Sequence, residues 1–257
     1  MSVSSADPAV LPPPEEKAAA VRRMFGAIAP RYDLLNHVLS LNIDRRWRRR
    51  AVDLLLEGRP LRGRFLDACA GTLDLAMELA GRRGFEGRIV ASDFSLPMLE
   101  RGLPKIDGHA VEPACADALC MPFPDETFDG ATVGFGVRNL ADLDAGLREF
   151  ARVLKPGARL VILEFTTPTF APVRALYLFY FLKVLPWIGR LVSRHGSAYT
   201  YLPASVLEFP PPAELARRMQ EAGFTNVKWK PLTMGIAAIH VGTRAVQPKL
   251  ESTASAA

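Results

Sequence analysis

An α/β fold built on one doubly wound, mostly parallel sheet is predicted from three features of the 257-residue sequence. Five short apolar stretches alternate with helical patterns between residues 64 and 165. These stretches are apolar at nearly every position, which is typical of parallel strands that are buried on both faces. The last two strand patterns, at 226–232 and 235–244, are joined by only a few residues. Because a parallel pair needs a long crossover, these two strands must form an antiparallel hairpin.

The strand and helix patterns follow one another in a regular order. Each predicted helix carries apolar residues at helical spacing. Asp44 is the expected N-cap of the second helix, Gly58 its stop, and Ser95 the cap of the fourth helix. The predicted strands are 64–70, 87–93, 111–117, 128–135, 155–165, 226–232 and 235–244, and the predicted helices are 15–29, 44–58, 73–82, 95–102, 142–154 and 211–222. This order predicts a Rossmann-like sheet of about seven strands with helices on both faces and a terminal antiparallel hairpin.

The composition is that of a single globular domain. Hydrophobic residues make up 49% and charged residues 23% of the chain. We expect one domain over 16–245, opened by N-terminal lid helices, with disordered tails at 1–15 and 246–257 because both tails are poor in large apolar residues. No apolar run reaches the ~18–20 residues of a transmembrane helix. The net charge of +5 permits an acidic or membrane-surface partner without requiring one.

The start of the chain and its cysteines suggest a cytoplasmic protein. The amino terminus has no basic stretch followed by an apolar block, so it does not resemble a secretory signal. The three cysteines stand in no metal-ligand spacing, and we expect no metal site. Cys69 and Cys115 fall in apolar, strand-like segments, where we expect reduced thiols in the core.

Acidic residues end three successive predicted strands. Asp67 ends the first strand, Asp93 the second and Asp117 the third. In doubly wound sheets ligands bind outside the carboxyl ends of the strands. Asp93 stands 22 residues after Gly71, a distance at which an acid commonly binds the two ribose hydroxyls of an adenosine. Each acid alone could equally be a helix cap, but three together favour a ligand site.

The loop "LDACAGTLDL" at 66–75 restricts the choice of adenosine cofactor. A dinucleotide site requires G-x-G-x-x-G, and the corresponding positions here are Cys69, Gly71 and Asp74. Asp74 would place a negative charge against the phosphates, which disfavours NAD and FAD. The phosphate loop of ATP-binding proteins is absent as well. S-adenosylmethionine carries no phosphate, its carboxylate suits the amides of a helix start, and its positive groups suit acids such as Asp67.

Four stretches of the chain resemble the ubiquinone/menaquinone biosynthesis C-methyltransferase family of class I methyltransferases. They are "YDLLNHVLSLNIDRRW" at 32–47, "LDACAGTLDLA" at 66–76, the long match at 122–165 that contains "FGVRN", and 199–242 ending in "GIAAIHVG". The resemblance covers most of residues 20–243. It implies methylation of a ring carbon on a prenylated quinol with S-adenosyl-L-methionine as the cofactor. By position, it places cofactor contacts at Thr72, Asp93, Asp117 and Ala118.

The sequence departs from the family pattern at several positions. Gly134 stands where the family has a serine contact, so that only its backbone could serve there. Asp44 replaces a histidine, and Asn42 replaces a glycine, which is mild because asparagine tolerates positive φ. Leu73 also replaces a glycine and would strain the turn or crowd the cofactor if it pointed into the site. These changes leave open a divergent paralogue that methylates another hydrophobic small molecule, or a noncatalytic protein of the same fold.

Candidate catalytic residues fall in three places. Arg138 and Asn139 follow the fourth strand. Arginine is a poor base, so we expect Arg138 to stabilise a developing phenolate. The alternative explanation is a surface arginine followed by an asparagine that caps a helix. Tyr32 and Asp33 lie in the expected lid. His240 lies in the final apolar strand, where a satisfied core histidine is the commoner outcome.

Two segments bear on partners other than the cofactor. The apolar segment 171–192 is too interrupted to span a bilayer; it could line a channel for an isoprenoid tail, lie on the inner face of a membrane, or pack on the sheet. The arginine run at 45–50 is most simply a solvated helix face, with anionic lipid second and RNA third. A nucleic-acid substrate is disfavoured because no RNA-binding module or base-clamping motif is present. A homo-oligomer is left open.

Overall fold

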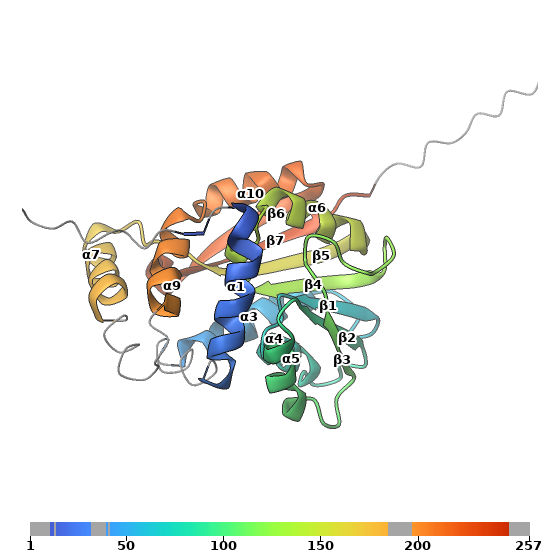
Figure 1. The fold of residues 1–257 in the computed structure, drawn as a ribbon. Coiled ribbons are helices and arrows are strands. Elements are labelled where there is room, and N and C mark those ends of the chain that lie inside the picture. Colours follow the sequence, from blue (N-terminus) through green and yellow to red (C-terminus); the bar gives the residue numbers. More distant parts are fainter. Residues whose placement is uncertain (1–10, 13, 32–39, 41, 185–196, 247–257) are drawn as a thin grey trace, which may run out of the picture.

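The fold is a seven-stranded sheet covered by helices on both faces (Figure 1). The computed structural model describes residues 11–12, 14–31, 40, 42–184 and 197–246. The strands are β1 (Arg64–Ala68), β2 (Arg88–Asp93), β3 (Val111–Cys115), β4 (Phe128–Gly134), β5 (Leu154–Phe165), β6 (Phe224–Leu232) and β7 (Ala237–Arg244). Their order in the sheet is β3-β2-β1-β4-β5-β7-β6. The predicted fold class is confirmed.

The direction of the strands puts one edge of the sheet in position for a ligand. Strands β1 to β5 are parallel, and β7 runs antiparallel between β5 and β6. The short helix Thr233–Gly235 and Ile236 join β6 to β7, which confirms the predicted hairpin. The strand order reverses between β1 and β4, and a doubly wound sheet binds its ligands at such a switch point.

Each face of the sheet has its own hydrophobic core. One core joins the sheet to α3 (Ile43–Leu56), α4 (Asp74–Ala80) and α5 (Leu96–Gly102). The other joins it to α6 (Leu143–Val153) and α10 (Pro212–Glu221). The central strands contribute to both cores because successive side chains point to opposite faces, which is why they are apolar throughout.

Three further helices lie beside the sheet rather than flat on its faces. Helix α1 (Pro14–Ile28) contacts α5, α9 (Ser197–Glu208) and the short helix Val137–Asn139, and so crosses the region of the strand ends (Figure 1). Helix α7 (Ala171–Phe179) continues into a π-helical turn, Tyr180–Val184, at the far end of the molecule from β3 (Figure 1). The short 3-10 helices are Ala29–Arg31, Leu103–Lys105, Val137–Asn139 and Thr233–Gly235.

Some local predictions were wrong. Asp44 does not cap α3: Asn42 occupies the N-cap with φ of 60°, and Asp44 is buried inside the helix. Ser95 occupies the N-cap of α5, but its side chain makes no capping bond. Cys115 is exposed rather than part of the core, because it ends β3 at the edge of the sheet. Helix α9 was not predicted, since Pro203 interrupts it and its apolar residues do not form a clear stripe.

Candidate functional site

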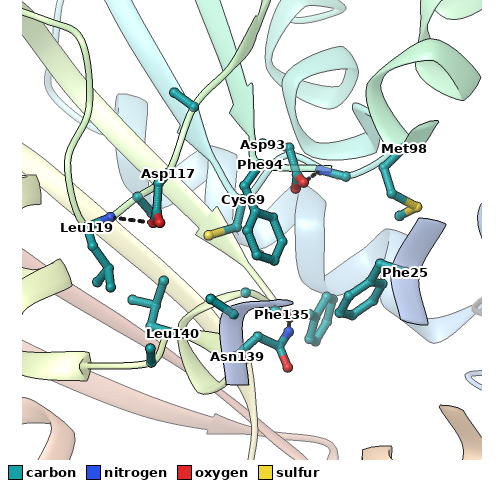
Figure 2. Close-up of a pocket in the computed structure, with 17 residues that line it drawn as sticks. Phe25, Cys69, Asp93, Phe94, Met98, Asp117, Leu119, Phe135, Asn139 and Leu140 are labelled. Carbon is teal, nitrogen blue, oxygen red and sulfur yellow. Dashed lines mark hydrogen bonds between the residues drawn. The ribbon is translucent and has the colours of Figure 1, made fainter. Parts of the chain in front are cut away.

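A cleft opens at the carboxyl ends of β1 to β4, beneath α1 (Figure 2). It contains about 680 Å³ of space, a volume that includes its open mouth. Its lining residues are Ala18, Phe25, Cys69, Gly71, Asp93, Phe94, Met98, Ala116, Asp117, Ala118, Leu119, Gly134, Phe135, Gly136, Asn139, Leu140 and Ala141. Five of the seven predicted cofactor residues are thereby brought together.

Asp93 anchors the loop that follows β1. Its Oδ2 accepts a hydrogen bond from the amide of Gly71 at 2.9 Å, and its Oδ1 accepts one from the amide of Ser95 at 2.8 Å. Burial raises the pKa of this carboxyl, and these two amides oppose the rise. Because each carboxylate oxygen has two lone pairs, Asp93 can hold the loop and still accept hydrogen bonds from a ligand.

In the loop after β1, every second residue from 69 to 73 has a left-handed backbone conformation. Cys69, Gly71 and Leu73 have φ of 54°, 54° and 70°, so only one of the three positions is the glycine that such backbone favours. Leu73 is fully buried in the core formed with α3, α4 and α5, and it does not line the cleft. The leucine therefore strains the turn but leaves the ligand site open.

A row of alternating charges fixes the start of α4 behind this loop. Arg48 of α3 forms ion pairs with Asp44 at 2.5 Å and with Asp74 at 3.3 Å. The ammonium of Lys105 lies 2.7 Å from Asp74 and donates to the carbonyl oxygen of Thr72 at 2.9 Å. Asp74 is thus neutralised by two cations outside the cleft. Asp44 supports the loop through Arg48.

Asp67 and Thr72 lie under the cleft rather than on its wall, and both are buried. The hydroxyl of Thr132 donates to Asp67 Oδ1 at 2.9 Å. Burial raises the pKa of Asp67 to about 7. Asp67 therefore changes charge near neutral pH at the base of the loop.

The far end of the cleft is formed by the residues after β3 and β4. Asp117 is exposed, and its Oδ1 accepts from the amide of Leu119 at 2.9 Å. Ala118 is buried beside it. Gly134 ends β4, and a Cβ added there would lie 3.1 Å from the tip of Leu75, so that a larger residue would require that leucine to shift.

Arg138 lies behind the cleft wall in a buried ion pair. Its Nη1 donates to Glu164 Oε1 at 2.6 Å and to the carbonyl oxygen of Phe135 at 2.5 Å. Its guanidinium also lies over the ring of Phe165, 5.5 Å from the centroid. Burial raises the pKa of Glu164, and the charge of Arg138 opposes that rise. The arginine is held rigidly and is not a surface residue.

Asn139 reaches the cleft itself. Its amide donates to the carbonyl oxygen of Phe135 at 3.3 Å, and its Oδ1 accepts from the hydroxyl of Tyr201 at 3.2 Å. Lys17 of α1 donates to the carbonyl oxygens of Arg138 and Leu140, at 3.0 and 2.7 Å. Burial lowers the pKa of Lys17. Helix α1 is thereby fastened to the segment that carries Arg138 and Asn139.

The other candidates lie elsewhere. His240 is buried on β7, where its Nε2 lies 2.9 Å from the carbonyl oxygen of Pro212 and its ring stacks on Trp229. It does not line the cleft. Burial lowers the pKa of His240 to about 4. Tyr32 and Asp33 lie outside the described residues.

Sequence reasoning missed Glu164 and Lys17. Glu164 follows an apolar run at the carboxyl end of β5, which is the same signal that identified Asp67 and Asp93. Lys17 gave no signal, because a lysine on an amphipathic helix is ordinarily exposed.

The charge of the cleft decides which ligands it suits. Its described lining residues include two carboxylates and no lysine, arginine or histidine. The nearby guanidinium of Arg22 lies over the ring of Phe94, 5.3 Å from its centroid. Asp93 and Asp117 suit the hydroxyl and amine groups of an adenosine, and Phe94, Met98 and Leu119 offer it apolar contacts. The residues present therefore fit S-adenosylmethionine better than a nucleotide.

Comparison with known proteins agrees with this geometry. The sequence profile of the ubiE/COQ5 methyltransferase family matches residues 14–244. The ubiquinone/menaquinone biosynthesis C-methyltransferase UbiE of Geobacter sp. (strain M21) is 50% identical over 234 residues, which are 89% of this chain and 98% of that protein. The demethylmenaquinone methyltransferase of Thermus thermophilus is 49% identical over 223 residues, 86% of this chain and all of that protein.

Solved structures support the fold independently. A SAM-dependent methyltransferase from Thermotoga maritima, described as a possible histamine N-methyltransferase, superposes with a TM-score of 0.62 at 20% identity, covering 86% of this chain and 98% of that one. At this identity the likeness shows the fold alone. The profile match over nearly the whole described domain, together with relatives at half identity, shows that the chain belongs to the ubiE/COQ5 methyltransferase family and is an S-adenosylmethionine-dependent methyltransferase.

Proposed function

We propose that this chain methylates a ring carbon of a prenylated quinol, in keeping with the names of its relatives, which act in ubiquinone and menaquinone biosynthesis. The observation that supports the proposal is that two different sites, one for the cofactor and one for the acceptor ring, lie next to each other. The cleft, whose described lining residues include two carboxylates and no lysine, arginine or histidine, ends at Asn139. The buried Arg138–Glu164 pair with its aromatic neighbours lies directly behind it.

The cofactor would be held by residues of the cleft and of the loop beneath it. Asp93 and Asp117 would accept hydrogen bonds from its adenosine, while Gly71, Ala118 and Gly134 leave backbone close to the ligand. Thr72 and Asp67 would act indirectly, by supporting the loop beneath the cleft. Bound S-adenosylmethionine supplies a methyl group that is activated by a positively charged sulfur.

The acceptor ring must be electron-rich for its carbon to act as a nucleophile, so the quinol rather than the quinone is the substrate. The ring carbon would take up the methyl group as the bond from that methyl to sulfur breaks, with S-adenosylhomocysteine as the leaving group, and the ring would then release its proton to solvent. Alignment and exclusion of water supply much of the catalysis in such a displacement. Helix α1, which covers the cleft and is fastened by Lys17, would provide that exclusion.

Arg138 would favour the negative charge that develops on the quinol oxygen, because its guanidinium group carries a positive charge. Glu164 holds it in place, and Asn139 would orient a water or hydroxyl at the edge of the cleft. Tyr32 and Asp33 remain candidates for the same side on sequence alone. We leave His240 out of the proposed catalytic set because of its contacts with α10 and Trp229.

The test is complementation of a bacterial strain that lacks its quinone C-methyltransferase. We expect the chain to restore methylated quinone and to remove the accumulated demethylquinone. Purified protein should methylate a reduced quinone and not the oxidised form. Persistent demethylquinone despite good expression would refute the substrate, and it would favour a paralogue acting on another hydrophobic molecule.

The apolar face of α7 suggests where such a substrate is met. Phe170, Leu176, Phe179 and Leu182 are 46 to 71% exposed, and residues 169–184 contain two basic and no acidic residues. No helix in the described part of the chain is long and apolar enough to cross a membrane. We therefore propose that this face rests on an anionic membrane surface on the cytoplasmic side. The arginines of α3 at 45, 46, 49 and 50 are exposed and would add to the attraction.

Flotation with liposomes tests the membrane contact. Leu176→Glu in the full chain should abolish recovery with vesicles that contain phosphatidylglycerol. Leu103→Glu, at an exposed leucine after α5, is the control and should float as wild type does. Equal flotation of both variants would contradict the assignment of this face.

A further inference from the structure

Helix α7 and its π-helical turn have an outer and an inner face of different character. The outer face carries the exposed apolar side chains described above. The inner face buries two residues, Tyr177 and Phe181, against Phe165 and neighbouring apolar residues. Tyr177 therefore lies between the exposed apolar side chains of α7 and Phe165 of β5.

The hydroxyl of Tyr177 is buried and has no hydrogen-bond partner among the described residues. The Nε of Arg138 is in the same condition. Buried polar atoms are nearly always paired, because leaving one unpaired costs free energy. A phenylalanine would fill the same space without that cost. Two such atoms in one neighbourhood indicate a missing polar partner.

The surroundings of Tyr177 suit a flat, oxygenated ring. Its own ring stacks on Phe181 with centroids 4.6 Å apart, and Phe181 lies 6.4 Å from Phe165. Phe165 in turn lies 4.5 Å from Phe135, which lines the cofactor cleft. The aromatic side chains thus run without a break from α7 to the cleft.

The Arg138–Glu164 ion pair acts on the Tyr177 hydroxyl. The charge of Arg138 lowers the pKa of this hydroxyl and that of Glu164 raises it. Burial dominates and raises the pKa of Tyr177 well above its ordinary value. The hydroxyl therefore keeps its proton at neutral pH and is available as a donor.

We propose that Tyr177 is a substrate-binding residue whose hydroxyl donates a hydrogen bond to a ring oxygen of the bound quinol. The inference rests on the proposed function and adds a residue and an approach direction to it. The ring enters beside Phe165, its oxygen pairs with Tyr177 and Arg138 Nε, and the prenyl tail leaves along the outer face of α7. The hydroxyl is unpaired without substrate and paired with it.

The test compares Tyr177→Phe with wild type in anaerobic equilibrium titrations. The probe is a dithionite-reduced demethylmenaquinone with a short prenyl chain, added in the presence of S-adenosylhomocysteine. We expect the quinol Kd, and the KM in turnover, to rise about tenfold, the effect of one lost hydrogen bond. The Kd for S-adenosylmethionine should stay within twofold, and the melting temperature should not fall, because the variant removes an unpaired buried hydroxyl.

The matched control is Tyr180→Phe, three residues along the same segment. Burial raises the pKa of Tyr180, and the charges of Arg138 and Glu164 are not among the causes. It should bind the quinol as wild type does. If the wild type binds the quinol and Tyr177→Phe binds it with an unchanged Kd, the inference is wrong and the proposed function stands. An equal loss of binding in Tyr177→Phe and Tyr180→Phe has the same meaning. A wild-type protein that binds no reduced quinone overturns the proposed function, and this inference with it.

Discussion

The side chain of Leu73 fills the space that a side chain at position 102 would need. A Cβ added to Gly102 would lie 2.7 Å from Leu73 Cδ1 and 2.9 Å from the carbonyl oxygen of Thr72. Leu73 holds a left-handed backbone conformation that costs a non-glycine residue about 1–2 kcal/mol. Burying a leucine offsets such a cost, because it contributes about 1.5–3 kcal/mol. The departure from the family glycine is thus tied to a second residue, on α5.

We expect Gly102→Ala to destabilise the protein by about 1–3 kcal/mol, the usual cost of overpacking a core. In a Leu73→Gly background the same substitution should cost less, because only the contact with the Thr72 carbonyl remains. Urea unfolding of the two single variants and the double variant measures this coupling.

The control for that cycle is Gly26→Ala in α1. A Cβ there would lie 3.7 Å from Pro97, an ordinary contact, so stability should be unchanged or rise by up to about 1 kcal/mol. Additive effects of Leu73→Gly and Gly102→Ala would show that the two residues do not compete for space.

Asp93 should matter more for cofactor binding than any other lining residue. Asp93→Ala removes the acceptor for the amides of Gly71 and Ser95 and the expected ribose ligand together. We expect the Kd for S-adenosylmethionine to rise at least 100-fold, or by about 2.7 kcal/mol. Asp117→Ala, at an exposed carboxylate, should give a smaller rise. Calorimetry measures both, and an unchanged Kd in Asp93→Ala would refute the site.

Asp67 should make stability fall as pH rises. Its pKa is raised to about 7 in the folded protein, against about 3.9 in an unfolded chain. Between those values the folded state keeps a proton that the unfolded state has released, so folding loses up to about 4 kcal/mol across the window. The variant Asp67→Asn does not lose stability in this way, because asparagine does not ionise. Its stability relative to wild type should therefore increase from pH 4 to pH 7, and a pH-independent difference would contradict the shift.

His240 should have the opposite pH dependence. Its pKa is lowered to about 4 by burial, against about 6.5 unfolded. As pH falls through this window the unfolded state takes up a proton that the folded state does not, which destabilises the fold by up to about 3 kcal/mol. His240→Gln, whose amide can still donate to Pro212, should gain stability relative to wild type from pH 6.5 to pH 4. Urea unfolding across that range checks the sign.

Much of the fold was predictable because its signals are local. Periodicity and turn residues gave the strands, most helices and the hairpin, and the short 233–235 connection fixed its direction. Helix α9 escaped because its stability depends on contacts with α1 and neighbouring segments rather than on its own pattern. Asp44 appeared to be a cap because nothing in the sequence shows that Arg48 of the same helix would neutralise it.

Only those site residues whose positions follow from the direction of the parallel strands could be predicted. Acids at strand ends must share one edge of a parallel sheet, so Asp93 and Asp117 could be grouped in advance. Which of these side chains face the cleft depends on the twist of each strand end and loop. Asp67 and Thr72 consequently lie beneath it, and His240 faces α10 instead.

The sequence by itself determined the sheet, its covering helices, the edge at which a ligand binds and the family to which the chain belongs. Only the tertiary structure decided where Leu73 points, how Asp74 is neutralised, and that Glu164 and Lys17 fix the segment that carries Arg138. The physical reason is that these outcomes depend on space and charge shared between residues far apart in the chain. The side chain of Leu73 fits into the core because Gly102, 29 residues later, leaves room for it.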